Sequence, residues 1–196
     1  METTLRLLLM LSRLLARARH AEGAFADALP LILAATGSVG GAAYRRQGEA
    51  LVLVAQSGMP GHLRRLVERL GAGEQAWFVA QQAASSGALT LDRELPQCET
   101  SAFAGALADA GWKQAAACPI MAGGEVLGVL LIAASAAHEI LPETLTALEI
   151  SGNTLALCLA SLPKARAGLA TAPMAPMVPP ERRSTRDTEP APRATA

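Results

Sequence analysis

Residues 115–134 read AAACPIMAGGEVLGVLLIAA, and this stretch decides the fold. It contains two β-type runs joined by a Gly-Gly turn. Strict alternation along the second run would place Val126, Leu130 and Ile132 on one face, and Leu127, Val129 and Leu131 on the other. Because neither face suits water, the sequence predicts an antiparallel sheet that is covered by helices or by a ligand pocket on both sides.

The composition indicates one domain followed by a tail, and it disfavours nucleic acid as a partner. The chain has 196 residues, of which 51% are hydrophobic and 17% are charged, so it can fill one apolar core. Its basic and acidic residues balance to a formal net charge of +0, which would not attract a phosphate backbone. Aromatic residues make up only 3% of the chain, too few for the stacking platforms of single-strand binders.

No targeting or membrane segment is expected. The arginines that follow the apolar run 7–11 reverse the charge order of a secretory signal peptide. No window approaches the roughly 18 apolar residues that a membrane helix needs. The three cysteines form no Cys-x-x-Cys pair and lie far apart, at positions 98, 118 and 158, so we expect reduced thiols. The sequence therefore predicts a cytoplasmic protein with no membrane partner.

The periodicity of the remaining sequence predicts helices and short strands in a definite order. We expect helices at 5–19, 24–35, 60–70, 74–86 and 99–110, a hairpin of strands 39–46 and 50–56, and a short strand at 88–92. Pro30 should lie in a first turn, at a kink or at a break of the second helix. Gly37 should end that helix.

A heptad pattern follows the quoted hairpin. Apolar or small residues alternate in steps of four and three through Leu141, Leu145, Leu148, Gly152, Leu155, Leu159 and Leu162. Such a seam is typical of a helix–helix interface, and it could join two copies of the chain together with Leu8 and Leu15 of the first helix. We expect a homodimer. The alternative is that the seam packs against the first helix within one chain.

The composition changes at Pro163. The segment 163–196 is rich in proline, alanine, threonine and arginine and has little to bury, so we expect a disordered tail after a domain at 1–162. Its arginines outnumber its acidic residues. They could bind an acidic partner, although a solvated linker is the simpler interpretation.

Several phrases, taken in order and spacing, resemble those of GAF domains, the small-molecule sensor modules of signalling proteins. They are LAATGSVGGAAY at 33–44, LVLVAQSGMP at 51–60, the pair Gly111-Trp112, and the quoted hairpin with its Cys-Pro-Ile, Gly-Gly and Val-Leu-Gly-Val-Leu elements. The resemblance extends over residues 5–162. Each phrase alone is mostly apolar residues and glycine, so the order and the spacing carry the resemblance.

The resemblance implies an α+β fold with a central antiparallel β-sheet of about five to six strands. In this GAF/PAS-like arrangement, the terminal helices pack on one face and a pocket covered by helices and loops lies on the other. The implied pocket wall includes Trp77, Phe78, Arg93, Cys98, Phe103, Trp112 and Cys118. The two tryptophans could instead anchor the core, because they are large side chains in an aromatic-poor chain.

The cofactor chemistry that GAF domains can carry leaves few traces in this sequence. The cyclic-nucleotide signature Asn-Lys-x-x-x-Phe-Asp-Glu is absent, and no histidine lies beside a cysteine for covalent tetrapyrrole attachment. His62 is the only plausible haem ligand, and a lone histidine on a helix is more commonly a surface residue. We expect no cofactor and no metal site.

Cys98 and Cys118 raise an enzymatic alternative, since free methionine sulfoxide reductases use cysteines in a GAF pocket. The Cys-Asp context of those enzymes is missing, and Cys118 fits a small buried strand residue. We therefore expect no enzyme, but a sensory or regulatory domain that binds a small molecule, or that acts through dimerisation and contacts with a signalling protein that supplies the output. The alternatives are a scaffold without a ligand and a thiol-based redox enzyme.

Overall fold

The structure, a computed structural model, describes residues 2–71, 78–95 and 102–162, without the side chains of residues 2 and 3. Over these residues the predicted α+β fold is present, with a six-stranded sheet in the order β3-β2-β1-β6-β5-β4 whose neighbouring strands are all antiparallel. The strands are β1 (Gly40–Gln47), β2 (Ala50–Ser57), β3 (Arg69–Leu70), β4 (Thr90–Asp92), β5 (Gln114–Ala122) and β6 (Glu125–Ala134). The helices are α1 (Glu2–Leu15), α2 (Ala21–Thr36), α3 (Gly61–Val67), α4 (Val79–Ser86), α5 (Ala102–Asp109) and α6 (Pro142–Ser161).

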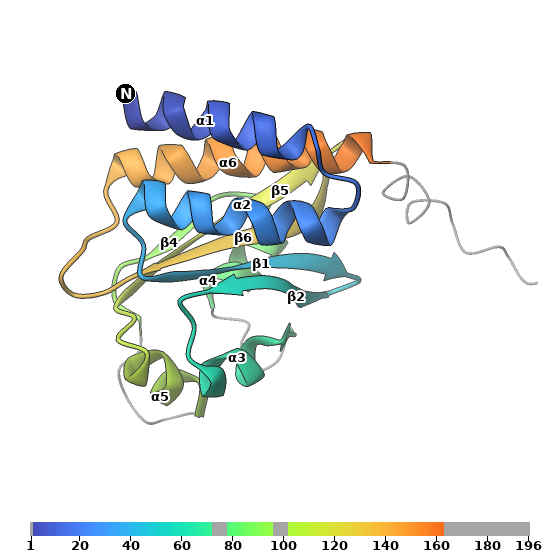
Figure 1. Ribbon diagram of the computed structural model, residues 1–196. Helices are drawn as coiled ribbons and strands as arrows, with labels where there is room; N and C mark the ends of the chain where they lie inside the picture. Colours follow the sequence, from blue (N-terminus) through green and yellow to red (C-terminus); the bar gives the residue numbers. More distant parts are fainter. Residues whose placement is uncertain (1, 72–77, 96–101, 163–196) are drawn as a thin grey trace, which may run out of the picture.

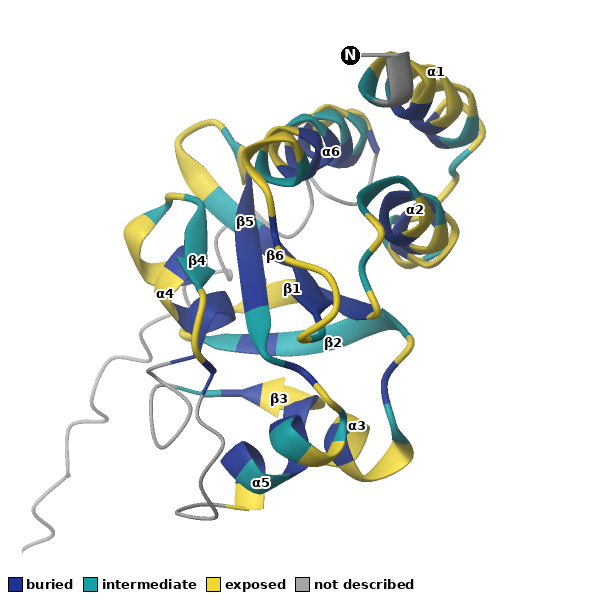
Figure 2. Cartoon of the chain, turned by 90° about the vertical axis from the view of Figure 1, so that its left-hand side faces the viewer, coloured by how far each residue is buried: buried dark blue, intermediate teal, exposed yellow. Residues whose placement is uncertain are grey.

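The terminal helices gather on one face of the sheet, here called the α6 face. Figure 1 shows α2 and α6 side by side above the strands, with α1 next to both. α2 contacts β1 and β2, whereas α6 contacts β5 and β6. The opposite face, here called the α4 face, carries α4 against β5 and β6, and α3 and α5 pack on each other beneath the sheet (Figures 1 and 2).

The prediction of a sheet that is buried on both sides is confirmed. On β5, Ala116, Cys118 and Ile120 belong to the apolar core of the α6 face, whereas Ala115 and Ala117 belong to the core of the α4 face. Residues 115–120 are all buried (Figure 2). An apolar strand with no wet side requires cover above and below it, and here helices supply that cover on both faces.

The strict alternation expected along β6 is wrong at its start. Ile120 pairs with Gly128 and Met121 with Val126, so Leu127 is an extra residue in a β-bulge. Leu127 consequently packs on the α6 face and Val126 on the α4 face, the reverse of the expected assignment. A bulge shifts the side-chain alternation by one residue, and the local sequence pattern does not contain that information.

Both predicted hairpins are present, because their turns have the glycines that the backbone needs. Gly123 and Gly124 connect β5 to β6 with φ of 61° and 84°, a conformation that residues with a side chain rarely adopt. Gly48 lies between β1 and β2 with φ of 62°. Gly37 ends α2 as predicted, and its N–H donates to the carbonyl of Leu33.

The helix predicted at 60–70 ends earlier, at Val67. Arg69 and Leu70 form β3 instead, because the backbone bonds to β2: the Leu53 N–H donates to the Glu68 carbonyl at 2.9 Å. Leu70 is fully buried in β3. A buried residue at this position also fits the inner side of a helix, so its spacing in the sequence does not distinguish a helix from a strand. The partner strand is remote in sequence and cannot be seen in a local pattern.

Two further expectations about helices need correction. The helix expected at 74–86 begins at Val79 in the described residues, because Phe78 is extended (φ −69°, ψ 138°); positions 74–77 lie outside them. Pro30 lies inside α2, which continues to Thr36, so the expected first-turn position or break is wrong. Pro30 is exposed, and water can satisfy the carbonyl that its missing N–H leaves free.

Candidate ligand-binding face

Three aromatic residues predicted to line a pocket lie in the core of the α4 face. Phe78 precedes α4, Phe103 lies in α5 and Trp112 precedes β5, with 0%, 5% and 1% of their surface exposed. The rings of Phe78 and Phe103 meet edge to face, with centroids 5.0 Å apart and planes at 87°. These residues are therefore brought together as expected, on the side of the sheet opposite the terminal helices.

Within the described part of the chain, the same core buries two polar atoms for which no hydrogen-bond partner is present. One is the phenolic oxygen of Tyr44 on β1, and the other is Nε2 of Gln81 in the first turn of α4. Tyr44 is 0% exposed and Gln81 is 5% exposed. Burial raises the pKa of the Tyr44 phenol far above its ordinary value, so this group stays a neutral hydroxyl.

Neither residue is among the predicted site residues. Tyr44 is the only tyrosine of the chain, and it follows four small residues in β1, which could have marked it. Gln81 has no comparable signal, because its burial depends on how α4 packs on β5 and β6. A glutamine in a helix of mostly small residues does not reveal which side faces the core.

Arg93 lies apart from these side chains, at the surface. It is exposed, and its Nη1 donates a hydrogen bond to Oε1 of Glu139 at 2.9 Å. Both side chains of this ion pair are more than half exposed to solvent. An ion pair of this kind contributes little to stability. The prediction of Arg93 as a ligand-binding residue has no further support in this geometry.

Cys118 is on the opposite face from Trp112, which corrects its assignment to the pocket wall. It packs in the α6-face core beneath α6, where a Cβ on Gly152 would come within 2.8 Å of its Sγ. Burial, and secondarily the charge of Glu149, raises the pKa of this thiol to about 12. A thiol with such a pKa forms almost no thiolate at neutral pH, so it is a poor nucleophile.

Trp77 and Cys98, the two remaining predicted pocket residues, lie outside the described residues. The start of the helix expected at 99–110 also falls in the segment 96–101, which is not described.

The seam predicted for a dimer is mostly buried inside the chain. Leu148, Gly152, Leu155 and Leu159 are buried on α6, and Leu162 follows it; Leu15 of α1 is buried too. Leu8 and Leu145 are half-buried, and Leu141 is exposed. α6 contacts α1, α2 and β5, so these intramolecular contacts account for the burial.

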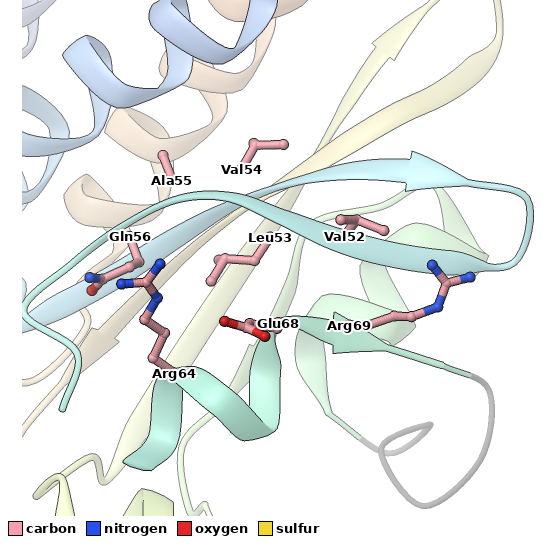
Figure 3. Close-up of a pocket in the computed structure, with 8 residues that line it drawn as sticks. All are labelled: Val52, Leu53, Val54, Ala55, Gln56, Arg64, Glu68 and Arg69. Atoms are coloured by element: carbon pink, nitrogen blue, oxygen red, sulfur yellow. The ribbon is translucent and has the colours of Figure 1, made fainter. Parts of the chain in front are cut away.

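Two cavities lie elsewhere on the molecule. A shallow groove of about 1390 Å³ surrounds the tips of both hairpins, and its lining includes Arg19, Arg46, Met121 and Leu159. A smaller cavity of about 560 Å³ runs along β2 beside α3 and β3 (Figure 3). None of the predicted pocket residues that the structure describes lines either cavity.

The described residues contain neither a membrane-spanning helix nor a cluster of metal-binding side chains. None of the helices there has both the length and the apolar character needed to cross a lipid bilayer. No cluster of three or more histidine, cysteine or acidic side chains occurs there that could hold a metal ion.

Comparison with known proteins gives matches by structure alone. No protein-family model matches the sequence, and no curated protein matches it significantly. The GAF domain of a phosphoenolpyruvate-protein phosphotransferase (ptsP) from Coxiella burnetii superposes with a TM-score of 0.68 at 19% identity, covering 87% of this chain and 98% of that chain. The GAF domain of A. aeolicus nlh2, in an inactive state, gives 0.61 at 19% identity over 81% of this chain and 96% of that one.

An enzyme has the same fold. Free methionine-R-sulfoxide reductase from Neisseria meningitidis, solved in complex with its substrate, matches with a TM-score of 0.65 at 15% identity, covering 84% of this chain and 91% of that chain. Identities this low establish shared architecture and leave activity undecided. The two-faced sheet with its terminal helices on one side, together with these superpositions, shows that the chain has the GAF domain fold.

Proposed function

We propose that this chain is a sensory or regulatory domain that binds a small molecule on the α4 face of its sheet. The observation that carries the proposal is the pair of buried polar atoms without partners, Tyr44 Oη and Gln81 Nε2. Such an atom costs about 1–3 kcal/mol when it is left unsatisfied, and native proteins rarely keep one unless water or a ligand satisfies it. A bound molecule with hydrogen-bond acceptors would satisfy both groups.

The chemistry of this face also limits the ligand. Among the described residues, no charged side chain is buried, and the α4 face buries the polar groups of Tyr44 and Gln81. A charged ligand group would lose its hydration there without gaining an opposite charge. The part of the ligand that enters should therefore be uncharged, with an apolar body beside Phe78 and Trp112 and an acceptor that faces Tyr44.

The proposed output runs through the terminal helices to a protein partner. Ligand binding on the α4 face would shift the packing of the sheet against α2 and α6, and any shift is limited by the ligand's different affinities for the two states. We also propose a cytoplasmic location, a functional domain at 1–162, and a tail at 163–196 that acts as a solvated linker.

Dimerisation is the second candidate, and exposed apolar side chains on the terminal helices favour it. Leu5, Leu9 and Met10 on α1 are 60%, 53% and 46% exposed, and Leu157 on α6 is 76% exposed. Exposed groups of large apolar residues are common at protein interfaces. We propose a homodimer that uses these residues in place of the buried seam, and a scaffold role if no ligand binds.

We do not extend the proposal to thiol chemistry. Cys118 lies beneath α6 on the other face of the sheet from Trp112, and burial raises its pKa. Cys98, the second thiol of that alternative, lies outside the described residues.

Native mass spectrometry of the freshly purified intact chain tests the ligand proposal. We expect an additional non-covalent mass that is lost on denaturation, and less of it in Tyr44→Phe and Gln81→Leu. Ser151→Ala is the matched control, because its hydroxyl donates to the Ala147 carbonyl on the other face at 2.7 Å. An apo mass in every preparation, together with no thermal shift from a library of neutral metabolites, would contradict the proposal.

Sedimentation equilibrium tests the dimer separately. Leu9→Glu should convert a dimer to a monomer, since burying a carboxylate in an apolar interface is costly. Ala26→Glu, at an exposed position of α2, should leave the dimer intact. A monomeric parent chain at high concentration would exclude the dimer without affecting the ligand proposal.

A further inference from the structure

The cavity along β2 has a chemistry different from that of the α4 face. It has a volume of about 560 Å³ and is lined by Val52, Leu53, Val54, Ala55, Gln56, Arg64, Glu68 and Arg69. Figure 3 shows Arg64 reaching from α3 toward Gln56, and Glu68 and Arg69 following along the chain below β2. Two guanidinium groups and one carboxylate therefore face an otherwise uncharged strand edge.

Neither of the two arginines forms an ion pair with a described residue. The ion pairs there join Arg45 to Glu22 and Arg93 to Glu139, and neither Arg64 nor Arg69 is within 4.0 Å of a carboxylate. Glu68 lines the same cavity without pairing with either of them. The cavity thus has a net positive charge and can accept an anionic partner.

A buried acceptor in the same cavity also has no partner. Gln56 Oε1 is buried and accepts no hydrogen bond from any residue that the structure describes. It lines the cavity between Ala55 and the Arg64 side chain (Figure 3). If the Gln56 amide turns toward the cavity, an N–H donor of a group that binds along β2, such as a peptide or a side-chain amide, would satisfy this oxygen.

The strand edge itself is open over part of its length. β3 pairs only with Leu51 and Val52, and the Leu53–Glu68 backbone bond is the last one. From Val54 to Ser57, the outer side of β2 has no strand partner within the described residues. Unpaired edges of this kind bind extended segments by main-chain hydrogen bonds.

The form of the cavity favours an extended segment over a compact anion. Its lining follows strand residues 52–56, and the part without a strand partner, from Val54 to Gln56, spans about 10 Å at about 3.3 Å per residue. The register shift at Val54, opposite Ala43 and Tyr44, is a bulge that bends the edge. A bent edge disfavours pairing with a whole second sheet but admits a short peptide.

From these observations we propose that the β2 edge binds a short acidic peptide segment of a partner protein in an extended conformation. Its backbone pairs with β2 beyond Leu53, and its carboxylates contact Arg64 and Arg69. A neutral residue opposite Glu68 would avoid like-charge repulsion. This interaction goes beyond ligand binding on the α4 face and does not depend on it.

Fluorescence anisotropy with the intact chain tests this proposal. The probe is a labelled short peptide in which glutamate alternates with valine, and lysine replaces glutamate in the control peptide. Arg64→Gln and Arg69→Gln should each weaken binding about twofold to fivefold, as expected for exposed ion pairs. Glu68→Gln should strengthen it by about twofold, because it removes the one repulsive charge in the cavity.

The matched control is Arg65→Gln, an exposed arginine of the same helix that does not line the cavity. It should leave the affinity unchanged, and N-methylation of the peptide backbone should weaken binding about fivefold for each hydrogen bond removed. Equal losses at Arg65 and Arg64 would overturn the proposal in favour of non-specific charge attraction. It would also be overturned by no binding of the acidic peptide, or by full displacement by a simple dicarboxylate at the same carboxylate concentration.

Discussion

The two faces of the same sheet are filled in different ways. The α6 face is packed mainly by aliphatic side chains, with Phe25 among them, and its buried hydroxyl, Ser151, donates to its own helix. The α4 face instead contains the chain's only tyrosine, several aromatic rings and a glutamine, with two polar atoms left unsatisfied. One face is a completed core. The other has the composition of a site that a guest molecule would complete.

Under the proposed function, the two faces of the sheet have different roles. A well-packed apolar layer is stiff and transmits strain, because its residues have few alternative arrangements. An under-satisfied polar layer gains free energy when a ligand arrives, so its state depends on the surroundings. In a sensor, the packed α6 face would transmit a change on the α4 face to the terminal helices.

The largest expected effect on stability comes from a cavity created in the core of the α6 face. Leu155 is 0% exposed between α6 and the sheet, and Leu155→Ala should lower the free energy of unfolding by about 2–5 kcal/mol. Urea denaturation measures this. Leu157→Ala is the control on the same helix, 76% exposed, and should change stability by less than about 0.5 kcal/mol. Similar small losses at both positions would show that the α6 face is not a packed core.

A smaller effect comes from the contact between α6 and β5. Gly152→Ala should place a methyl group 2.8 Å from Cys118 Sγ and destabilise the chain by about 1–3 kcal/mol, despite the better helix propensity of alanine. Removing the sulfur in Cys118→Ala should abolish most of this cost in the double variant. Thermal unfolding of the four chains gives the coupling energy, and strictly additive effects would contradict the contact.

The elements predicted well are those whose signals are local. The hairpin turn at Gly123-Gly124 and the helix end at Gly37 require positive φ, and glycine marks them directly in the sequence. By contrast, β3 forms because Arg69 and Leu70 pair with β2. The bulge at Leu127 forms because the register between β5 and β6 shifts by one residue there. Both depend on residues brought together by folding, which a periodicity cannot reveal.

The candidate site was predicted only in part, for a related reason. Large aromatics stand out in this chain, and the structure brings Phe78, Phe103 and Trp112 into one core, whereas Cys118 lies in the core of the other face. That the three aromatics contact a ligand stays a prediction. Both faces of β5 are apolar, so alternation separates Cys118 from Ala117 without saying which one lies beneath α6. The polar atom of Gln81 could be recognised only after α4 was seen packed on the sheet.

Removal of a single hydroxyl group tests whether the α4 face contains an unsatisfied polar atom. Tyr44→Phe removes a buried oxygen that has no partner, so the ligand-free chain should become more stable by about 1 kcal/mol. For a chain of this size, the melting temperature should rise by about 2–4 °C. Differential scanning calorimetry measures it after ligand is removed by refolding. A lower melting temperature would mean that the hydroxyl has a partner within the protein.

The smallest effect concerns the thiol beneath α6 and its dependence on pH. Burial raises the pKa of Cys118 from its ordinary 9.0 to about 12, so the folded chain holds this proton more tightly than the unfolded chain. Between these values the unfolded state loses the proton first, and the free energy of unfolding therefore falls as the pH rises. The contribution is fully present below pH 9.0 and is lost progressively toward about 12.

At pH 9.5, this loss should be just under about 1 kcal/mol, and it should be absent from Cys118→Ala. Urea denaturation of both chains at pH 7.5 and pH 9.5 isolates it, because Tyr44 and the other groups titrate in both. Equal pH dependences would mean that water reaches Cys118 and that α6 does not seal this side of the sheet. The α6 face would then no longer be the closed counterpart of the α4 face, and the thiol would become open to redox chemistry.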